Sequence, residues 1–162
     1  MTLDDCTFRD LEPGDAGWVA MRHGALYWAD EGYDIAFEGL VLAVLAEFIA
    51  NRGPRDRAWI AVDAAGTRQG CVFCVWPDAE VAKLRMFLVE PAMRGTGLAR
   101  RMLKSLIEHA RANGARKVVL WTHESHRAAG RLYARSGFDL VSTVPVVAYG
   151  QPTVEQTWEL TL

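Results

Sequence analysis

Hydrophobic residues recur along this chain at two different spacings, and the spacing changes from one segment to the next. A spacing of three to four residues, which places side chains on one face of a helix, occurs in the segments 15–29, 37–49 and 98–110. The apolar positions are Val19, His23, Leu26 and Tyr27; Phe37, Leu40, Val41, Val44, Leu45, Phe48 and Ile49; and Leu98, Met102, Leu103, Leu106, Ile107 and Ala110. We therefore predict three helices, the third ending at Asn113-Gly114.

Short apolar runs bounded by turn residues predict strands. They cover residues 6–12, 57–63, 69–76, 82–89 and 117–121, with a final pair at about 138–148 and 153–161. Residues 64–67 predict a hairpin turn, and a fourth helix, which contains Tyr133, ends at Gly137. The sequence shows no internal repeat and no linker-like segment, so we predict a single domain over residues 1–162.

Composition narrows the class of protein. The chain has 162 residues, of which 51% are apolar, and a net charge of −2, as in an ordinary globular domain. This charge balance argues against nucleic acid as a partner. The chain begins without a charged-then-apolar signal segment, and no apolar run approaches the length needed to span a membrane. We expect a cytoplasmic protein with no membrane partner.

The cysteines do not predict redox or metal chemistry. Cys6, Cys71 and Cys74 are odd in number, and the Cys71–Cys74 pair lies in a predicted strand. Side chains three residues apart in a strand point to opposite faces of the sheet. No second cysteine or histidine pair completes a ligand set, so we expect no metal site.

The segment from Lys83 to Ala99 carries the most specific signal. It is an apolar strand followed by Pro91 and then by a turn with Gly95 and Gly97 that opens a predicted helix. Glycines let the backbone approach an anion closely, and the start of a helix presents free N–H groups to it. This arrangement predicts a pyrophosphate-binding loop.

Three phosphate-binding patterns were compared with this loop. The dinucleotide pattern G-x-G-x-x-G requires a small residue where this chain has Arg100, and the nucleoside-triphosphate loop requires Gly-Lys-Ser/Thr, which is absent. The third pattern, Arg/Gln-x-x-Gly-x-Gly/Ala, is matched by Arg94, Gly97 and Ala99. It resembles the coenzyme A loop of the GNAT superfamily of acetyltransferases.

A second motif strengthens this resemblance. Residues 126–138 are similar to the GNAT signature Asn-x-x-Ala-x-x-Leu-Tyr-x-x-x-Gly-Phe, with His126 at the usual Asn position. The order of predicted elements also resembles that of the family along the whole chain. The resemblance implies an α/β (α+β) GNAT fold, in which a mixed, mostly antiparallel sheet of about seven strands is flanked by about four helices.

Four shorter segments resemble a bacterial GNAT subgroup whose members often follow a MarR-type winged-helix domain. They are residues 14–18, 22–24, 81–85 and 156–160. No such domain precedes them in this sequence, so we assign no DNA-binding role.

The family resemblance implies acetyl-CoA as co-substrate and direct transfer of its acetyl group to a primary amine of a small molecule or peptide. The residues implied in binding acetyl-CoA are Phe87, Leu88, Val89, Arg94, Gly95, Thr96, Gly97, Leu98, Ala99 and His126. Tyr133 matches the position of the family's general acid, which assists the leaving thiolate. A non-catalytic acyl-CoA sensor is the alternative, and a homodimer is possible.

The general base is left open by the sequence. Many relatives use a Glu on the strand before the loop, where this chain has Lys83 and Arg85. We take His23 and Glu80 as candidates, with His123 or a water relay as further alternatives. The aromatic residues Trp18, Tyr27, Trp28 and Tyr33 indicate either a stacking pocket for the acceptor or core packing.

Overall fold

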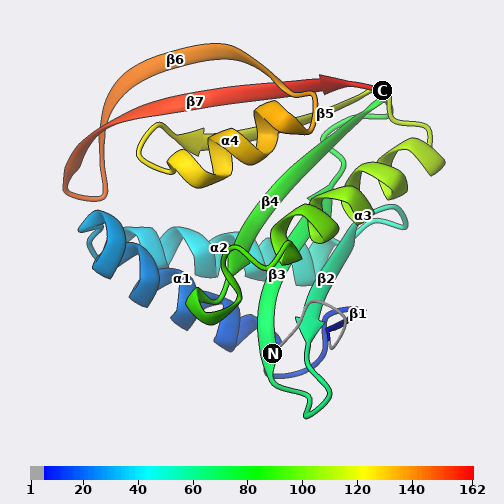
Figure 1. Cartoon of the computed structure of the whole chain (residues 1–162), viewed down its shortest axis with the longest axis horizontal. Helices are drawn as coiled ribbons and strands as arrows, with labels where there is room; N and C mark the ends of the chain where they lie inside the picture. The colour runs from blue at the N-terminus through cyan, green and yellow to red at the C-terminus, as the bar shows by residue number, and fades with distance from the viewer. Residues whose placement is uncertain (1–5) are drawn as a thin grey trace.

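The computed structural model describes residues 6–162 and consists of one twisted sheet between two layers of helices (Figure 1). The strands are β1 (Thr7–Arg9), β2 (Arg57–Val62), β3 (Arg68–Val75), β4 (Val81–Val89), β5 (Lys117–His123), β6 (Asp139–Ala148) and β7 (Gln151–Thr161). Their order in the sheet is β1-β2-β3-β4-β5-β7-β6. Neighbouring strands are antiparallel, except that β4 and β5 are parallel.

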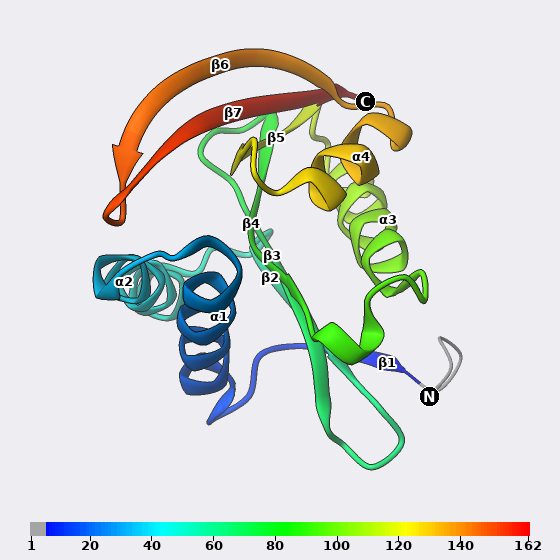
Figure 2. The ribbon, with the colours of Figure 1, turned by 60° about the vertical axis from the view of Figure 1, so that its left-hand side comes forward.

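Four helices and one short turn cover the sheet. The helices are α1 (Asp15–Glu31), α2 (Ile35–Asn51), α3 (Leu98–Ala112) and α4 (Arg127–Arg135), and the 3₁₀ turn η2 (Pro91–Met93) precedes α3. Helices α1 and α2 lie on one face of the sheet, and α3 and α4 lie on the other (Figure 2). Among the described residues, no helix has both the length and the apolar composition needed to cross a bilayer.

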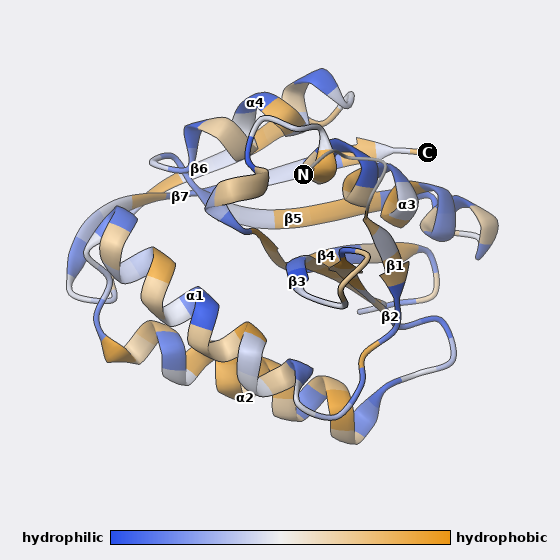
Figure 3. Ribbon diagram, turned by 60° about the horizontal axis from the view of Figure 1, so that its bottom comes forward, coloured by the Kyte–Doolittle hydropathy of each residue, from blue (hydrophilic) through white to orange (hydrophobic). Residues whose placement is uncertain are grey.

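The predicted order of elements is confirmed, with small differences at the ends. Strand β1 is shorter than predicted and β5 continues to His123. The predicted helix over 37–49 is confirmed, but two residues of its hydrophobic pattern, Leu40 and Ile49, are 40% and 56% exposed. Only the row Val41, Leu45 and Phe48 is buried, and hydrophobic positions are spread around the helix (Figure 3).

Two separate hydrophobic clusters hold the layers together. One lies between the sheet and α3, where Met102, Leu103 and Leu106 are fully buried, and the other packs Val41 and Leu45 of α2 against the opposite face. Cys74 belongs to the first cluster and Cys71 to the second. The prediction that these two side chains face opposite sides of the sheet is confirmed.

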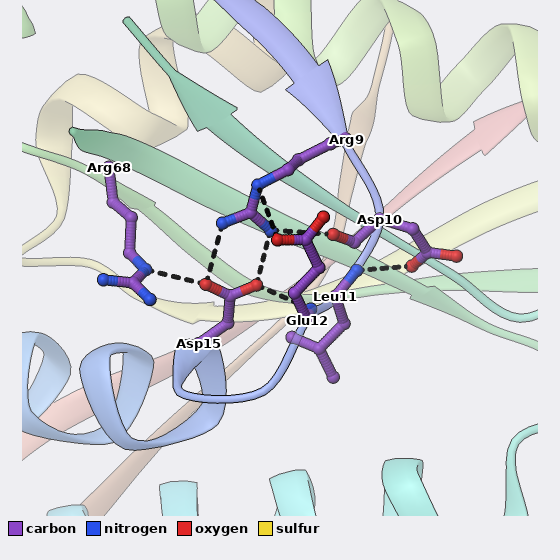
Figure 4. Close-up of polar contacts among 6 residues, drawn as sticks. All are labelled: Arg9, Asp10, Leu11, Glu12, Asp15 and Arg68. Carbon is purple, nitrogen blue, oxygen red and sulfur yellow. Dashed lines mark hydrogen bonds and ion pairs between the residues drawn. The ribbon is translucent and has the colours of Figure 1, made fainter. Parts of the chain in front are cut away.

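A buried carboxylate fixes the start of α1 to the sheet. The side chain of Asp15 is fully buried and accepts hydrogen bonds from Arg9 on β1 (2.6 and 3.0 Å) and Arg68 on β3 (2.7 Å). It also accepts the backbone N–H of Glu12 (2.7 Å), and the contacts converge as Figure 4 shows. A short acidic side chain in the first turn also suits the positive end of the helix dipole.

A bulge and a divergence of strands shape the centre of the sheet. Between the pairs Cys71–Leu88 and Phe73–Arg85, β4 has one residue more than β3, and Met86 adopts a positive φ of 50°. Strand β4 pairs with β5 only over Val81–Lys83. Beyond Lys83 the two strands separate, which leaves the β5-side edge of β4 without a partner strand.

The β6–β7 hairpin curves over α1 and α2 (Figure 2). Its two-residue turn is Tyr149-Gly150, between the paired residues Ala148 and Gln151. The backbone carbonyl of Tyr149 accepts the N–H of Asp34 (3.0 Å), which joins the tip of the hairpin to the start of α2.

Candidate active site

A cleft of about 760 Å³ opens where β4 separates from β5. Its floor is formed by Phe87, Leu88 and Val89 of β4. The loop before α3, the start of α4 and the C-terminal part of α1 form its walls, with Arg94, Gly95, Gly97, Ala99, Ser125, His126, Tyr27 and Glu31 among the lining residues. The cleft therefore contains most of the residues predicted to bind acetyl-CoA.

The loop at Gly95–Gly97 has the geometry expected for binding an anion. Both glycines have positive φ angles, 77° and 96°, a region that other residues rarely adopt. The N-cap residue Gly97 has no side chain to cap α3, so the N–H groups of the first turn beyond that of Leu98 are available to a ligand. These features fit a pyrophosphate group.

Two predicted ligands of this loop have structural roles. The Thr96 hydroxyl donates to the carbonyl of Met93 (2.8 Å) and accepts the N–H of Leu98 (3.4 Å), which braces the turn. The side chain of Leu98 is fully buried in the core beneath α3. Neither residue lines the cleft through its side chain.

Arginine side chains surround the cleft. Arg94 lies at the loop and forms an ion pair with Asp30 at the end of α1 (3.0 Å). The other arginines that line the cleft are Arg100, Arg127, Arg131 and Arg135. The positive charge suits a ligand with several phosphates. The three arginines of α4 were not predicted, although they lie within the second motif.

Tyr133 of α4 is buried beneath the cleft floor. Its ring centroid lies 5.7 Å from Phe138, 6.2 Å from Trp158 and 6.5 Å from Phe87. Burial raises the pKa of the phenol, so the hydroxyl stays protonated at neutral pH. The hydroxyl makes no hydrogen bond with another described residue. The ring is buried, but the hydroxyl oxygen is not among the fully buried atoms, so this protonated hydroxyl is suited to donate to a ligand.

His126, which caps the start of α4, faces an acidic residue of α1. Its Nδ1 atom lies 3.1 Å from the Thr122 hydroxyl, and its Nε2 atom lies 3.5 Å from Oε1 of Glu31. The Nε2 atom is buried and has no hydrogen-bond partner among the described residues. Burial lowers the pKa of His126, Glu31 raises it and His123 lowers it further, with a net shift downward.

An aromatic cluster extends from this pair. The Tyr33 hydroxyl and Nδ1 of His123 are 2.9 Å apart, and the rings of His123 and His126 are 5.6 Å apart. Tyr27 packs edge-on against His126, and Tyr149 packs against Tyr33. Of the aromatic residues predicted to form either a stacking pocket or core, Tyr27 and Tyr33 belong to this cluster. Trp28 is 72% exposed and belongs to neither.

The structure does not bring His23 or Glu80 to the cleft. His23 is buried within α1 behind Tyr27, where Nδ1 donates to the Val19 carbonyl (2.8 Å), and burial lowers its pKa to about 4. Glu80 precedes β4 at the end opposite the cleft, is exposed, and forms an ion pair with Arg116 (3.0 Å). Neither residue therefore lines the cleft, where a general base would have to reach the acceptor.

Comparison with known proteins identifies the family. The model of the acetyltransferase (GNAT) family matches residues 18–138, which include the loop, β4 and the Tyr133 helix. The chain belongs to the GNAT family. Its seven-stranded mixed sheet flanked by four helices is the GNAT fold.

Individual relatives agree with this assignment. The chain is 29% identical over 147 residues, or 88% of its length, to a mycothiol acetyltransferase of Gordonia bronchialis. The GCN5-related N-acetyltransferase from Kribbella flavida has a TM-score of 0.77 at 25% identity, with 98% of this chain and 99% of that one covered. A spermidine N-acetyltransferase from Vibrio cholerae, solved with CoA and spermine, has a TM-score of 0.73 at 17% identity, with 98% and 96% covered.

The matched relatives differ from this chain in length. The chain spans between 15% and 40% of the length of the curated relatives that it matches, the mycothiol acetyltransferase of Gordonia bronchialis being matched over 40%.

Proposed function

We propose that this protein is an acetyl-CoA-dependent N-acetyltransferase that transfers the acetyl group to a primary amine by direct attack on the thioester. The observation that carries this proposal is the position of Tyr133. The centroid of its ring lies 6.5 Å from that of Phe87, which belongs to the cleft floor at the edge of β4 that has no partner strand. We infer that the Tyr133 hydroxyl serves as a proton donor to a ligand in this cleft.

The cleft fits coenzyme A at both of its ends. The loop Gly95–Gly97, the start of α3 and the surrounding arginines suit a pyrophosphate. The unpaired edge of β4 at Phe87–Val89 can form strand-like hydrogen bonds with an extended amide chain such as pantetheine. When bound, acetyl-CoA supplies an acyl carbon activated toward nucleophiles, with a thiolate as leaving group.

Tyr133 acts on the leaving group in this proposal. A thiolate with a solution pKa of about 8.5 is a better hydrogen-bond acceptor than a thioester sulfur, so a fixed phenol stabilises it as the C–S bond breaks. Because burial raises the phenol pKa, Tyr133 holds its proton until that charge develops. This makes the hydroxyl most useful in the transition state.

Glu31 and His126 are placed to receive the proton that the attacking ammonium must lose. In the tautomer in which Nδ1–H donates to Thr122, Nε2 and the Glu31 carboxylate are two acceptors 3.5 Å apart with no donor between them. Such a pair binds an ammonium and then takes its proton. We therefore assign this role to Glu31 and His126 in place of His23 and Glu80.

Thiol release tests the proposed function against the sensor alternative. Purified protein is mixed with acetyl-CoA and a panel of small amines, amino acids and lysine peptides, and free CoA is measured. We expect release with at least one amine, together with its N-acetylated product by mass spectrometry. Acetyl-CoA binding without release for any member of the panel would favour a sensor.

Three further expectations rest on the sequence alone and stay predictions. They are the resemblance to GNAT domains linked to MarR-type regulators, a homodimer, and a cytoplasmic location. The spermidine enzyme shows that this fold accommodates a polyamine.

A further inference from the structure

Strand β4 carries two cations on the face covered by α1 and α2. Arg85 pairs with Phe73 and Lys83 pairs with Val75, and in a sheet directly paired residues point to the same face. Phe73 belongs to the hydrophobic cluster on the α1–α2 side, whereas Leu84 belongs to the cluster beneath α3. Both cations therefore lie on the face opposite to α3, just before the bulge at Met86.

Arg85 is partly buried and has no protein partner. It makes no hydrogen bond, ion pair or ring contact with another described residue. Other arginines removed from solvent to a similar degree are paired: Arg22 forms two 2.6 Å hydrogen bonds with Glu90, and Arg9 is bound to Asp15. A guanidinium withdrawn from water without an acceptor is unfavourable and is suited to a planar anion such as a carboxylate.

Lys83 is also turned toward this face without an acidic partner. Its Nζ atom lies 3.4 Å from the centroid of the Trp121 ring, and burial lowers its pKa, an effect that the neighbouring Arg85 strengthens. Glu155 is the acidic residue nearby, and it forms no ion pair with Lys83 or with His123 among the described residues. Among the described residues, neither cation forms an ion pair with an acidic side chain, and the ammonium of Lys83 packs over Trp121.

Tyr149, at the tip of the β6–β7 hairpin, belongs to the same region as Arg85. It has a φ of 53°, and Gly150 has a φ of 77°, the pattern of a type I′ turn, whose first central position favours Asn, Asp or Gly. A tyrosine there is strained, and strained residues concentrate at binding sites. Its ring packs against Tyr33 and Phe37 (each 5.1 Å), and it lies close enough to Arg85 for each to shift the pKa of the other.

A series of packed rings connects Tyr149, near Arg85, to the proposed proton acceptors Glu31 and His126. The ring of Tyr149 lies 6.2 Å from His123, which in turn lies 5.6 Å from His126. His123 thus lies within ring-packing distance both of Tyr149 and of His126, which is paired with Glu31. A small molecule that carries both a carboxylate and an ammonium is complementary to these two groups of residues.

We propose that Arg85, assisted by Lys83 and Tyr149, binds the carboxylate of an amino-acid acceptor whose amine is directed toward Glu31 and His126. The proposal rests on the proposed function for the reaction itself. In that reaction the ammonium first loses one proton to Glu31 and His126, and the amine nitrogen then forms a bond to the acetyl carbon. The C–S bond breaks to give a thiolate that takes a proton from Tyr133, and the second proton lost by the nitrogen restores that of Tyr133. Arg85 takes no part in bond making and serves to position the acceptor.

Matched acceptors provide the test. Each of several L-amino acids is compared with its amide and with its decarboxylated amine, for example phenylalanine, phenylalaninamide and phenethylamine. We expect kcat/KM to be about 10- to 100-fold higher for the acids, since a charge-assisted bidentate contact is lost in the other two. Arg85→Gln should remove this preference and Arg85→Lys should restore part of it. Arg116→Gln, which changes an exposed arginine at the other end of the sheet, should leave it unchanged.

The melting temperature distinguishes a binding role of Arg85 from a structural role. Because the unliganded guanidinium is partly desolvated and unpaired, Arg85→Met should melt at the same or a higher temperature than the parent protein, and a clear decrease would oppose the proposal. Equal kcat/KM for acids and decarboxylated amines, or an unchanged preference in Arg85→Gln, would overturn it.

The test also separates failure of this proposal from failure of the proposed function. If the parent protein releases no thiol with any amine, the proposed function fails and the carboxylate site is judged by binding alone. N-acetylated amino acids should then raise the melting temperature of the CoA-saturated protein, whereas N-acetylphenethylamine should not, and Arg85→Gln should abolish the difference. Absence of that difference in the parent protein would overturn the carboxylate site.

Discussion

The Nε2 atom of His126 lies 3.5 Å from the Oε1 atom of Glu31, and it is buried without a hydrogen bond. The pair joins the start of α4 to the end of α1, two helices from opposite faces of the sheet. The separation of β4 and β5 allows this contact, because the cleft passes between the two layers at that point. In the proposed function, this is where the acyl donor and the acceptor meet.

The first prediction concerns the pH dependence of acetylation. A proton acceptor must be unprotonated to work, so the rate should fall as pH drops through the pKa of His126, which burial lowers below its ordinary value. Glu31 raises that pKa, so Glu31→Gln should move the acidic limb of the kcat profile to lower pH. His126→Asn should remove this limb and lower kcat.

A direct contact between His126 and coenzyme A, which the sequence predicts, gives a different result. Protonation would then tighten acetyl-CoA binding at low pH, and His126→Asn would flatten that dependence without lowering kcat. Acetyl-CoA dissociation constants measured from pH 5 to 8, beside the kcat profile, separate the two roles. Identical profiles for both variants and the parent would contradict both.

The second prediction tests the phosphate loop. Acetyl-CoA at a hundredfold excess over its dissociation constant should stabilise the protein by about 2.7 kcal/mol. Gly97→Glu introduces a negative charge and a side chain at a φ of 96°, where phosphate is expected, and should abolish the stabilisation. Gly66→Glu is the matched control, because Gly66 has a φ of 81° in an exposed turn with open space around it. Thermal melts with and without acetyl-CoA measure the effect, and a gain retained by Gly97→Glu would contradict the assignment.

The third prediction concerns Tyr133. Tyr133→Phe keeps the ring contacts with Phe138 and Trp158 and removes only the hydroxyl, which has no protein partner. The melting temperature should therefore hardly change, while kcat should fall by about 10²- to 10⁴-fold because the proton donor is lost. Single-turnover kinetics with a saturating acceptor measure this step. A parent-like kcat would show that Tyr133 is structural.

Some of the residues in these predictions could be identified from the sequence, whereas others could be identified only from the structure. The phosphate loop was predictable because its signal is local: Gly95 and Gly97 are two residues apart, and the helix that follows is fixed by the stripe from Leu98 to Ala110. Tyr133 was predictable for the same reason, since its motif lies within one helix and the following turn.

The proton acceptor was not predictable because it depends on tertiary geometry. His23 and Glu31 both lie on α1, and only the packing of that helix decides that His23 is buried in the core while Glu31 faces the cleft. Arg85 lies next to a bulge at Met86, and a residue insertion of this kind changes which face the following side chains take. A period-2 pattern in the sequence does not reveal such an insertion.

The fourth prediction concerns the stability of the fold at low pH. Burial alone would raise the pKa of Asp15, but hydrogen bonds from Arg9, Arg68 and the Glu12 N–H outweigh it and lower the pKa to about 2. In the unfolded chain the pKa is about 3.9, so the ionised carboxylate contributes roughly 2 to 3 kcal/mol at neutral pH. This contribution is complete above about pH 4 and is lost as pH falls toward 2.

Asp15→Asn should remove that dependence and leave two arginines without their acceptor. We expect a loss of about 3 kcal/mol in the free energy of unfolding at pH 7 and a smaller difference from the parent at pH 2.5, both measured by urea denaturation. Asp139→Asn, at an exposed position on β6, is the control and should change stability by less than about 0.5 kcal/mol. Equal pH dependence in Asp15→Asn and the parent would contradict the role of Asp15.

The fifth prediction concerns Tyr149, whose backbone has a positive φ and which interacts electrostatically with Arg85. Two substitutions separate strain from side-chain function. Tyr149→Ala removes the ring and keeps an unfavourable residue at a φ of 53°, whereas Tyr149→Asn removes the ring and introduces a residue that tolerates this conformation. Tyr149→Asn should therefore be more stable than Tyr149→Ala by about 1 kcal/mol in chemical denaturation.

Activity should not follow this order of stability. Both variants lack the hydroxyl and the ring, so both should raise the KM for an amino-acid acceptor to a similar extent and leave the KM for acetyl-CoA unchanged. Tyr149→Phe keeps the contacts with Tyr33 and Phe37 and should show the effect of the hydroxyl alone, a smaller rise in acceptor KM. If the acceptor KM instead tracks stability across the three variants, Tyr149 only supports the hairpin. Independence of the two measurements is expected of a strained residue kept for binding, because the strain is tolerated only where the side chain serves the ligand.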